Sequence, residues 1–162
     1  MPDLASDRLL AVPGLDVRDL LREDLEQVIR IDALHTGKAE PEYWKRVFGD
    51  FLGGAADRKR VGLAATREGR LVGYLLGEVR AFEFGSEACG WVFGVGVDPT
   101  SARSGAASTL LAEGCRRFQA AGVKRIRTMV RRNNVPVLSF FRANGFGAGS
   151  FVQLELDLEE EP

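Results

Sequence analysis

The sequence has few cysteines and histidines, and it lacks long apolar runs. Cys89 and Cys115 are the only cysteines, and His35 is the only histidine, among 162 residues. Two thiols without paired spacing form neither a disulfide framework nor a metal site, so we expect reduced cysteines and no metal. No stretch approaches the roughly 20 apolar residues of a membrane span, and no signal-like segment opens the chain. We therefore expect a cytoplasmic protein with no membrane partner.

The chain also has no excess of charge. Lys and Arg number 22 against 23 Asp and Glu, which gives a formal net charge of -1. Binding to nucleic acid rests on a basic excess, so we expect no nucleic-acid partner. A hydrophobic fraction of 45% is that of a globular chain, and 162 residues fit one domain. We expect an N-terminal extension over 1–13, the domain over 14–158 and an acidic tail over 159–162.

Hydrophobic periodicity predicts a mixed α/β fold. Period-2 patterns predict strands over 14–21, 61–67, 71–80, 90–97, 125–130 and 151–158, the second and third joined by a tight hairpin. Helical spacing predicts helices over 22–34, 41–52 and 104–121, and a short one between Asn134 and Asn144. Gly94 and Gly96 predict a bulge in their strand. This order indicates a sheet with helices on its faces.

The segment between the strand 90–97 and the long helix is suited to an anion. Ala102 to Ala107 opens the helix, where several backbone N–H groups have no intrahelical partner and can converge on a phosphate. Gly105 allows close approach, and Arg103 can add a charge-assisted contact. A pyrophosphate is the natural ligand. The alternative is that the small residues serve only close packing of the helix on a strand.

Two blocks of sequence resemble the GNAT superfamily of acyl-CoA-dependent N-acetyltransferases. Val97-Asp98-Pro99, the loop 102–107 and Leu110-Leu111 are similar to that family's acyl-CoA-binding strand, loop and helix. Downstream, the blocks 130–134, 137–141 and 144–146 are similar to its asparagine, helix and terminal glycine-phenylalanine. The resemblance spans about 17–158. It implies a mostly antiparallel central sheet, flanked by about four helices and splayed between the fourth and fifth strands.

The resemblance also implies acetyl-CoA as cosubstrate and a set of residues that hold it. The acyl-pantetheine would lie in the splay and pair with strand backbone, the loop would hold the pyrophosphate, and Asn134 would contact the pantetheine arm. The implied cofactor-binding residues are Val95, Gly96, Val97, Ala102, Arg103, Ser104, Gly105, Ala106, Ala107, Asn134 and Phe141.

The sequence departs from the family at three positions. Ala102 stands where the family usually has Arg or Gln. Phe141 stands where a tyrosine often protonates the departing thiolate, and Trp91 where many relatives have a glutamate base. Glu78, Glu83 and Glu87 are therefore the candidate bases, with Glu87 nearest the strand in sequence; each is otherwise an ordinary solvated acid. His35, expected in a loop, is either a surface residue or part of the acceptor entrance.

The leading hypothesis is direct acetyl transfer to a primary amine in a ternary complex, with the Val95 N–H as oxyanion donor. The acceptor is a protein lysine or N-terminus, or a small amine. A CoA-binding sensor without turnover is the alternative, and a structural domain without cofactor is a third. The aromatic helix face around Tyr43 and Trp44 is either core or substrate contact. The apolar segment 151–158 leaves a homodimer open.

Overall fold

The computed structural model describes residues 12–52 and 59–159. The chain divides into two compact units, residues 1–129 and 130–162, each described by itself below. Most of the predicted N-terminal extension 1–13 and of the acidic tail 159–162 lies outside the described residues. Both cysteines are free thiols, with Cys89 buried.

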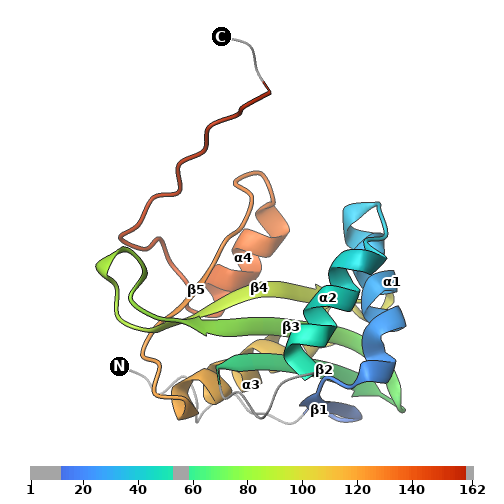
Figure 1. The fold of residues 1–162 in the computed structure, drawn as a ribbon. Helices are drawn as coiled ribbons and strands as arrows, with labels where there is room; N and C mark the ends of the chain where they lie inside the picture. The colour runs from blue at the N-terminus through green and yellow to red at the C-terminus, as the bar shows by residue number, and fades with distance from the viewer. Residues whose placement is uncertain (1–11, 53–58, 160–162) are drawn as a thin grey trace. The chain divides into compact units, whose positions relative to one another are not determined.

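The first unit is built on a five-stranded sheet in the order β1-β2-β3-β4-β5 (Figure 1). β1 to β4 pair antiparallel, and β5 runs parallel to β4. The β2–β3 hairpin turns at Glu68 and Gly69, which both have positive φ, as a two-residue hairpin turn requires. The strands are β1 (Leu15–Asp19), β2 (Arg60–Arg67), β3 (Arg70–Arg80), β4 (Cys89–Val97) and β5 (Ile126–Thr128).

Helix α3 (Ala106–Ala120) covers one face of this sheet. Because side chains alternate along a strand, the residues on either side of Leu76 in β3 share the face that α3 covers. Leu75 packs against Gly114 of α3, and the Phe118 ring lies over Gly77 of β3 and Gly90 of β4. A Cβ on Gly90 would come within 2.9 Å of that ring, so these strands admit α3 only because they carry glycine there.

Helices α1 (Leu25–Thr36) and α2 (Pro41–Leu52) cover the opposite face (Figure 1). Tyr74 and Leu76 of β3 point into this layer. Gly37, with φ of 81°, ends α1, and Pro41 begins α2, where a missing N–H costs nothing. The core of the layer contains Leu20, Val28, Ile31, Trp44, Val47, Phe48, Ala64, Leu71, Tyr74 and Leu76.

The second unit contains α4 (Val135–Ala143). The Asn134 side chain caps it by accepting a hydrogen bond from the Val137 amide at 3.3 Å. Phe141 is buried and its ring makes edge contacts with those of Phe140 and Phe146. Gly145 adopts φ of 91° directly after the helix. The short helix predicted between Asn134 and Asn144 is confirmed.

The mixed α/β, mostly antiparallel architecture is as predicted; in the described residues it comprises five strands and four α-helices. The strand predicted over 151–158 is wrong: residues 151–157 have no regular structure, and Val152, Leu154, Leu156 and Leu158 are exposed. Alternation fits a strand, but strand structure also needs a paired neighbour. The loop expected at His35 is also wrong, because α1 continues to Thr36 and ends only at Gly37.

Candidate active site

Strand β4 carries a β-bulge at Phe93. Leu76 of β3 pairs with Gly94, whereas the next β3 residue, Gly77, pairs with Val92. Phe93 is therefore the extra residue, and the bulge predicted from the glycines of this strand is confirmed. Pairing between β4 and β5 ends at Val92 and Thr128, whose hydroxyl donates to the Val92 carbonyl at 2.8 Å.

Beyond the bulge, one edge of β4 is not paired to β5 in the described residues. The Asp98 amide donates to the Val72 carbonyl at 2.8 Å, and Tyr74 pairs with Gly96. Hydrogen-bonded pairs recur at every second residue of an antiparallel ladder, so Gly96 faces β3. The peptide groups of Val95 and Val97 therefore point away from β3, toward the side where β5 has already ended. This is the splay between the fourth and fifth strands that the sequence predicts.

His35 contacts this open edge. Its Nε2 lies 2.7 Å from the carbonyl oxygen of Val97, which ties the last turn of α1 to the end of β4. His35 is exposed, as one of its two expected roles requires. The contact engages the Val97 carbonyl. Among the described residues, the Val95 peptide groups remain for a ligand.

Asp98 anchors the loop that follows β4. Its carboxylate accepts hydrogen bonds from the Thr100 amide at 3.0 Å and from Arg30 Nη2 at 2.8 Å. These bonds to the charged form, the Thr100 amide foremost, lower the pKa of the buried Asp98 to about 2. Asp98 is therefore an ionised structural residue that fixes where the loop begins.

The loop 102–107 presents backbone donors at the start of α3. Arg103 and Gly105 both adopt left-handed conformations, with φ of 64° and 85°. The Thr109 amide donates to the Gly105 carbonyl at 3.0 Å, so the amides of Ala106 and Ala107, which precede it, have no intrahelical acceptor. The Ser104 hydroxyl is buried and lacks a hydrogen-bond partner in the described part of the chain. Free donors at a helix N-terminus and an unsatisfied hydroxyl suit a pyrophosphate.

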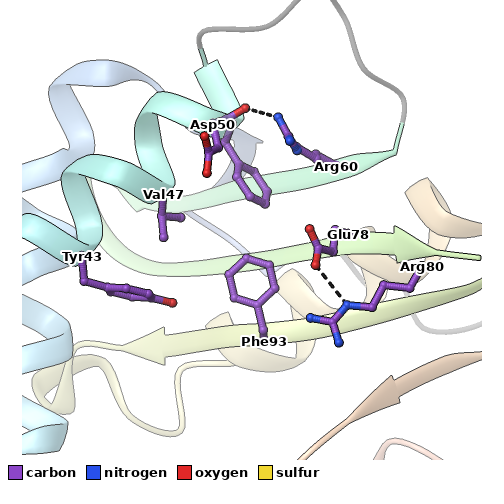
Figure 2. Close-up of a pocket in the computed structure, with 8 residues that line it drawn as sticks. Tyr43, Val47, Asp50, Arg60, Glu78, Arg80 and Phe93 are labelled. Carbon is purple, nitrogen blue, oxygen red and sulfur yellow. Dashed lines mark hydrogen bonds and ion pairs between the residues drawn. The ribbon is translucent and has the colours of Figure 1, made fainter. Parts of the chain in front are cut away.

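On the α1–α2 side, a cavity of about 320 Å³ opens between α2 and strands β2, β3 and β4 (Figure 2). Aromatic side chains and two pairs of opposite charges line it. Phe93 points into it from the bulge, so the cavity and the open edge of β4 meet at this residue. The lining residues are Tyr43, Val47, Asp50, Phe51, Arg60, Glu78, Arg80 and Phe93.

Of the three candidate bases, only Glu78 lines this cavity. Its Oε1 accepts a hydrogen bond from Arg80 Nε at 3.0 Å, and the Arg80 guanidinium lies 4.9 Å from the centre of the Trp91 ring. Glu83 begins a short exposed turn after β3, and Glu87 follows it; neither lines the cavity. Trp91, which replaces the family's glutamate, thus supports the arginine that pairs with Glu78.

The predicted cofactor residues fall into both units. Val95, Gly96, Val97 and the loop from Ala102 to Ala107 belong to the first, while Asn134 and Phe141 belong to the second. The predicted aromatic face divides: Trp44 and Phe48 are core, whereas Tyr43 and Phe51 line the cavity.

Sequence reasoning did not single out Arg60, Arg80 or Phe93. Alternation along the strand predicted over 71–80 places Leu76, Glu78 and Arg80 on one face. Arg80 could therefore have been predicted to lie beside Glu78, one of the candidate bases. No local pattern indicates the hydrogen bond from His35 to Val97, since 62 residues separate them.

Comparison with known proteins identifies the family of the chain. Residues 16–146 match the model of the Acetyltransferase (GNAT) family. The chain is 32% identical, over 87 residues, to mycothiol acetyltransferase of Saccharomonospora viridis; the match covers 52% of this chain and only 28% of that protein.

Solved structures share the fold. A transcriptional regulator of Bacillus halodurans superposes with a TM-score of 0.75 at 20% identity, covering 89% of this chain and 99% of the other. An aminoglycoside N-acetyltransferase in complex with CoA has a TM-score of 0.75 at 17% identity, with 89% and 95% covered. An aminoglycoside 6′-N-acetyltransferase of Acinetobacter baumannii has a TM-score of 0.72 at 15% identity, with 90% and 99% covered.

Two kinds of feature are absent from the described residues. In residues 12–52 and 59–159, no group of three or more His, Cys, Asp or Glu side chains could hold a metal ion. No helix of that part is both long and apolar enough to cross a membrane. Because the family match runs from within β1 to three residues beyond the end of α4, the chain belongs to the GNAT family of acetyltransferases, enzymes that use acetyl-CoA.

Proposed function

We propose that this protein transfers the acetyl group of acetyl-CoA to a primary amine held in the cavity of Figure 2. One observation supports the proposal: Phe93, the bulge residue next to the open edge of β4, also lines the cavity on the α1–α2 side of the sheet. A thioester along the edge and an amine in the cavity would meet at this bulge. Direct transfer within one ternary complex needs that proximity and no covalent enzyme intermediate.

The residues of the first unit fit acetyl-CoA. The open carbonyl group of Val95 would pair with the pantetheine, beside Gly96 and Val97. The amides of Ala106 and Ala107 and the Ser104 hydroxyl would hold the pyrophosphate, with Arg103 at the rim, between Ala102 and the helix. Bound acetyl-CoA supplies the activated thioester carbonyl. In this proposal the Val95 N–H donates to its oxygen, as an oxyanion donor does.

The contacts of Asn134 and Phe141 with the pantetheine arm remain part of this proposal. Asn134 already uses its side-chain oxygen on the Val137 amide, which leaves its amide nitrogen for a ligand. Phe141 has no proton to give, so water would protonate the departing thiolate. Because the pKa of a thiol is about 8.5, that thiolate can leave without prior protonation.

Glu78 is our candidate for the base. An alkylammonium with a pKa near about 10.4 is mostly protonated at neutral pH and must lose a proton before it attacks. Glu78 lines the cavity and has one oxygen without a hydrogen-bond partner among the described residues, since Arg80 occupies only Oε1. Its place beside the bulge favours Glu78 over the two glutamates that lie outside the cavity.

The first experiment measures binding and turnover separately. Thermal shift and calorimetry with acetyl-CoA and with free CoA report binding, since a ligand of the folded state raises its stability. Release of thiol in the presence of a mixed panel of amines and peptides then reports transfer. We expect both. Binding without amine-dependent thiol release would favour the sensor alternative, and absence of binding would refute both readings.

We also propose that residues 151–158 pair with a second copy of this chain. Val152, Leu154, Leu156 and Leu158 are between 78% and 88% exposed, an unusual state for four alternating apolar side chains. Light scattering after gel filtration tests this: we expect a dimer for the full chain and a monomer after truncation at Gly149. A monomeric full chain contradicts it.

A further inference from the structure

The size of the cavity limits the acceptor. Its volume of about 320 Å³ lies at the low end of the roughly 300 to 1,000 Å³ of small-molecule sites. The rings of Phe51 and Phe93 meet edge to face, with centroids 5.8 Å apart, and with Tyr43 they form an apolar wall. The space therefore suits a small molecule with an apolar or aromatic part.

The charges of the cavity exclude one class of amine. Two acids, Asp50 and Glu78, stand beside two guanidinium groups, Arg60 and Arg80 (Figure 2). A polycation such as an aminoglycoside would gain from the acids but meet two like charges in the same small space. A ligand that carries one charge of each sign can pair with one acid and one guanidinium group, and Arg60 already donates to the Asp50 carbonyl oxygen.

Arg80 and Glu78 are arranged for such a ligand. Arg80 uses Nε to hold Glu78, and its guanidinium plane rests on Trp91, so its orientation is fixed from two sides. Within the described residues the terminal nitrogens of Arg80 have no hydrogen-bond partner, and a guanidinium fork binds a carboxylate through two parallel hydrogen bonds. The second oxygen of Glu78 is available in the same way for an ammonium group.

We infer that the acceptor is an α-amino acid with an apolar or aromatic side chain. Its carboxylate lies on Arg80, its amine on Glu78, and its side chain against the wall of Tyr43, Phe51 and Phe93. This inference rests on the proposed transferase function and names its substrate class. In the transfer, Glu78 takes one proton from the ammonium group and passes it to solvent; an N–C bond then forms as the C–S bond breaks, and water carries the second nitrogen proton to the departing thiolate. The products are an N-acetylamino acid and CoA.

Matched acceptors test the role of the carboxylate. Phenylalanine, phenylalaninamide and phenethylamine share the ring and the amine, and only the first carries a carboxylate. We expect kcat/KM for phenylalanine to exceed that of the other two by about tenfold or more, as loss of a charged hydrogen-bond pair predicts. Kanamycin serves as the polycationic comparison and should be the poorest acceptor.

Variants of Arg80 test where that preference arises. Arg80→Gln should bring the ratio of kcat/KM for phenylalanine to that for phenethylamine close to one, whatever it does to the rate that both acceptors share through Glu78, and Arg80→Lys should restore part of the ratio. Arg70→Gln is the matched control, because Arg70 lies at the other end of β3, outside the cavity.

Outcomes for the acceptor and for the transferase function are distinguishable. Equal acetylation of phenylalanine and phenethylamine, or better acetylation of kanamycin, would overturn the inference and leave the transferase intact. If no amine is acetylated, the proposed transferase function is refuted. Calorimetry then tests separately whether the cavity binds phenylalanine. Phenylalanine binding that is lost in Arg80→Gln then supports the inference, and absence of binding refutes it.

Discussion

Arg30 of α1 and Asp98 after β4 lie 68 residues apart in the chain and meet in an ion pair of 2.8 Å. The pair fixes the start of the loop that precedes α3. The pKa of Asp98 falls from 3.8 to about 2 in the fold, through the Thr100 amide first and Arg30 next. A lowered folded pKa gives stability that is present above the unfolded value and lost as the pH falls through the folded one.

We therefore expect Asp98→Asn to cost about 1 to 3 kcal/mol of unfolding free energy near neutral pH, as loss of a charged hydrogen-bond network does. The difference between variant and parent should shrink as the pH falls from about 4 toward 2, because the parent then loses the same charge. Urea unfolding at several pH values measures it. A deficit that stays constant down to the lowest pH would contradict the role of the charge.

Gly96 should not tolerate a side chain. A Cβ there would lie 2.7 Å from the Tyr74 ring, which burial on the α1–α2 side prevents from moving. We expect Gly96→Ala to lose about 1 to 3 kcal/mol of stability through overpacking. Gly94→Ala is the matched control on the same strand, because its nearest contact would be an ordinary 3.5 Å from Leu76. Equal urea midpoints for the two variants would contradict this.

Ser104→Ala should separate stability from cofactor binding. Removal of a buried hydroxyl that has no hydrogen-bond partner among the described residues should leave the free protein as stable as before, or more stable by up to about 1 kcal/mol. If the hydroxyl contacts the pyrophosphate, the Kd for CoA should rise by about threefold or more, since one hydrogen bond to a charged group is lost. Pantetheine, which has no phosphate, should bind as before. Calorimetry measures both ligands, and an unchanged CoA affinity would remove Ser104 from the site.

Glu78→Gln should slow transfer more than the same change at the other two candidate bases. We expect kcat to fall by about 100-fold, the lower range for removal of a general base, with little change in the Kd for acetyl-CoA. Glu83→Gln and Glu87→Gln keep the charge change but lie outside the cavity, so each should retain activity within about twofold. Thiol release at saturating amine gives the comparison. A larger loss in Glu87→Gln would move the base to the loop after β3.

Local sequence patterns predicted most of the fold because the structure satisfies them locally. Pro41 begins α2, Asn134 caps α4, and Gly69 provides the left-handed turn of the β2–β3 hairpin. Gly105 likewise precedes α3 in a left-handed conformation, and the binding of a pyrophosphate by this loop stays a prediction. Such signals depend on neighbours in the chain and survive any tertiary arrangement.

The remaining features depend on partners distant in sequence. Residues 151–158 have the alternation of a strand. A strand also needs hydrogen bonds to a neighbouring strand, and the sequence of the segment does not specify that neighbour. Nearness in sequence favoured Glu87 as the base, whereas the antiparallel register places Glu78 opposite Trp91 and beside the cavity. The hydrogen bond from His35 to Val97 similarly requires α1 to pack on β4.

The Phe118 ring touches the backbone of two strands, at Gly77 and Gly90, with no side chain between. Because no side chains lie between this ring and the strand backbone, none can change rotamer to accommodate a movement of the helix. A shift or tilt of α3 against the sheet therefore has a high energetic cost. The start of α3, where we propose that the pyrophosphate binds, and the open edge of β4 therefore keep a fixed spacing before any ligand arrives. A long, flexible cosubstrate would then bind to a preformed site. The conformational entropy lost on binding would be that of the ligand and not that of the protein.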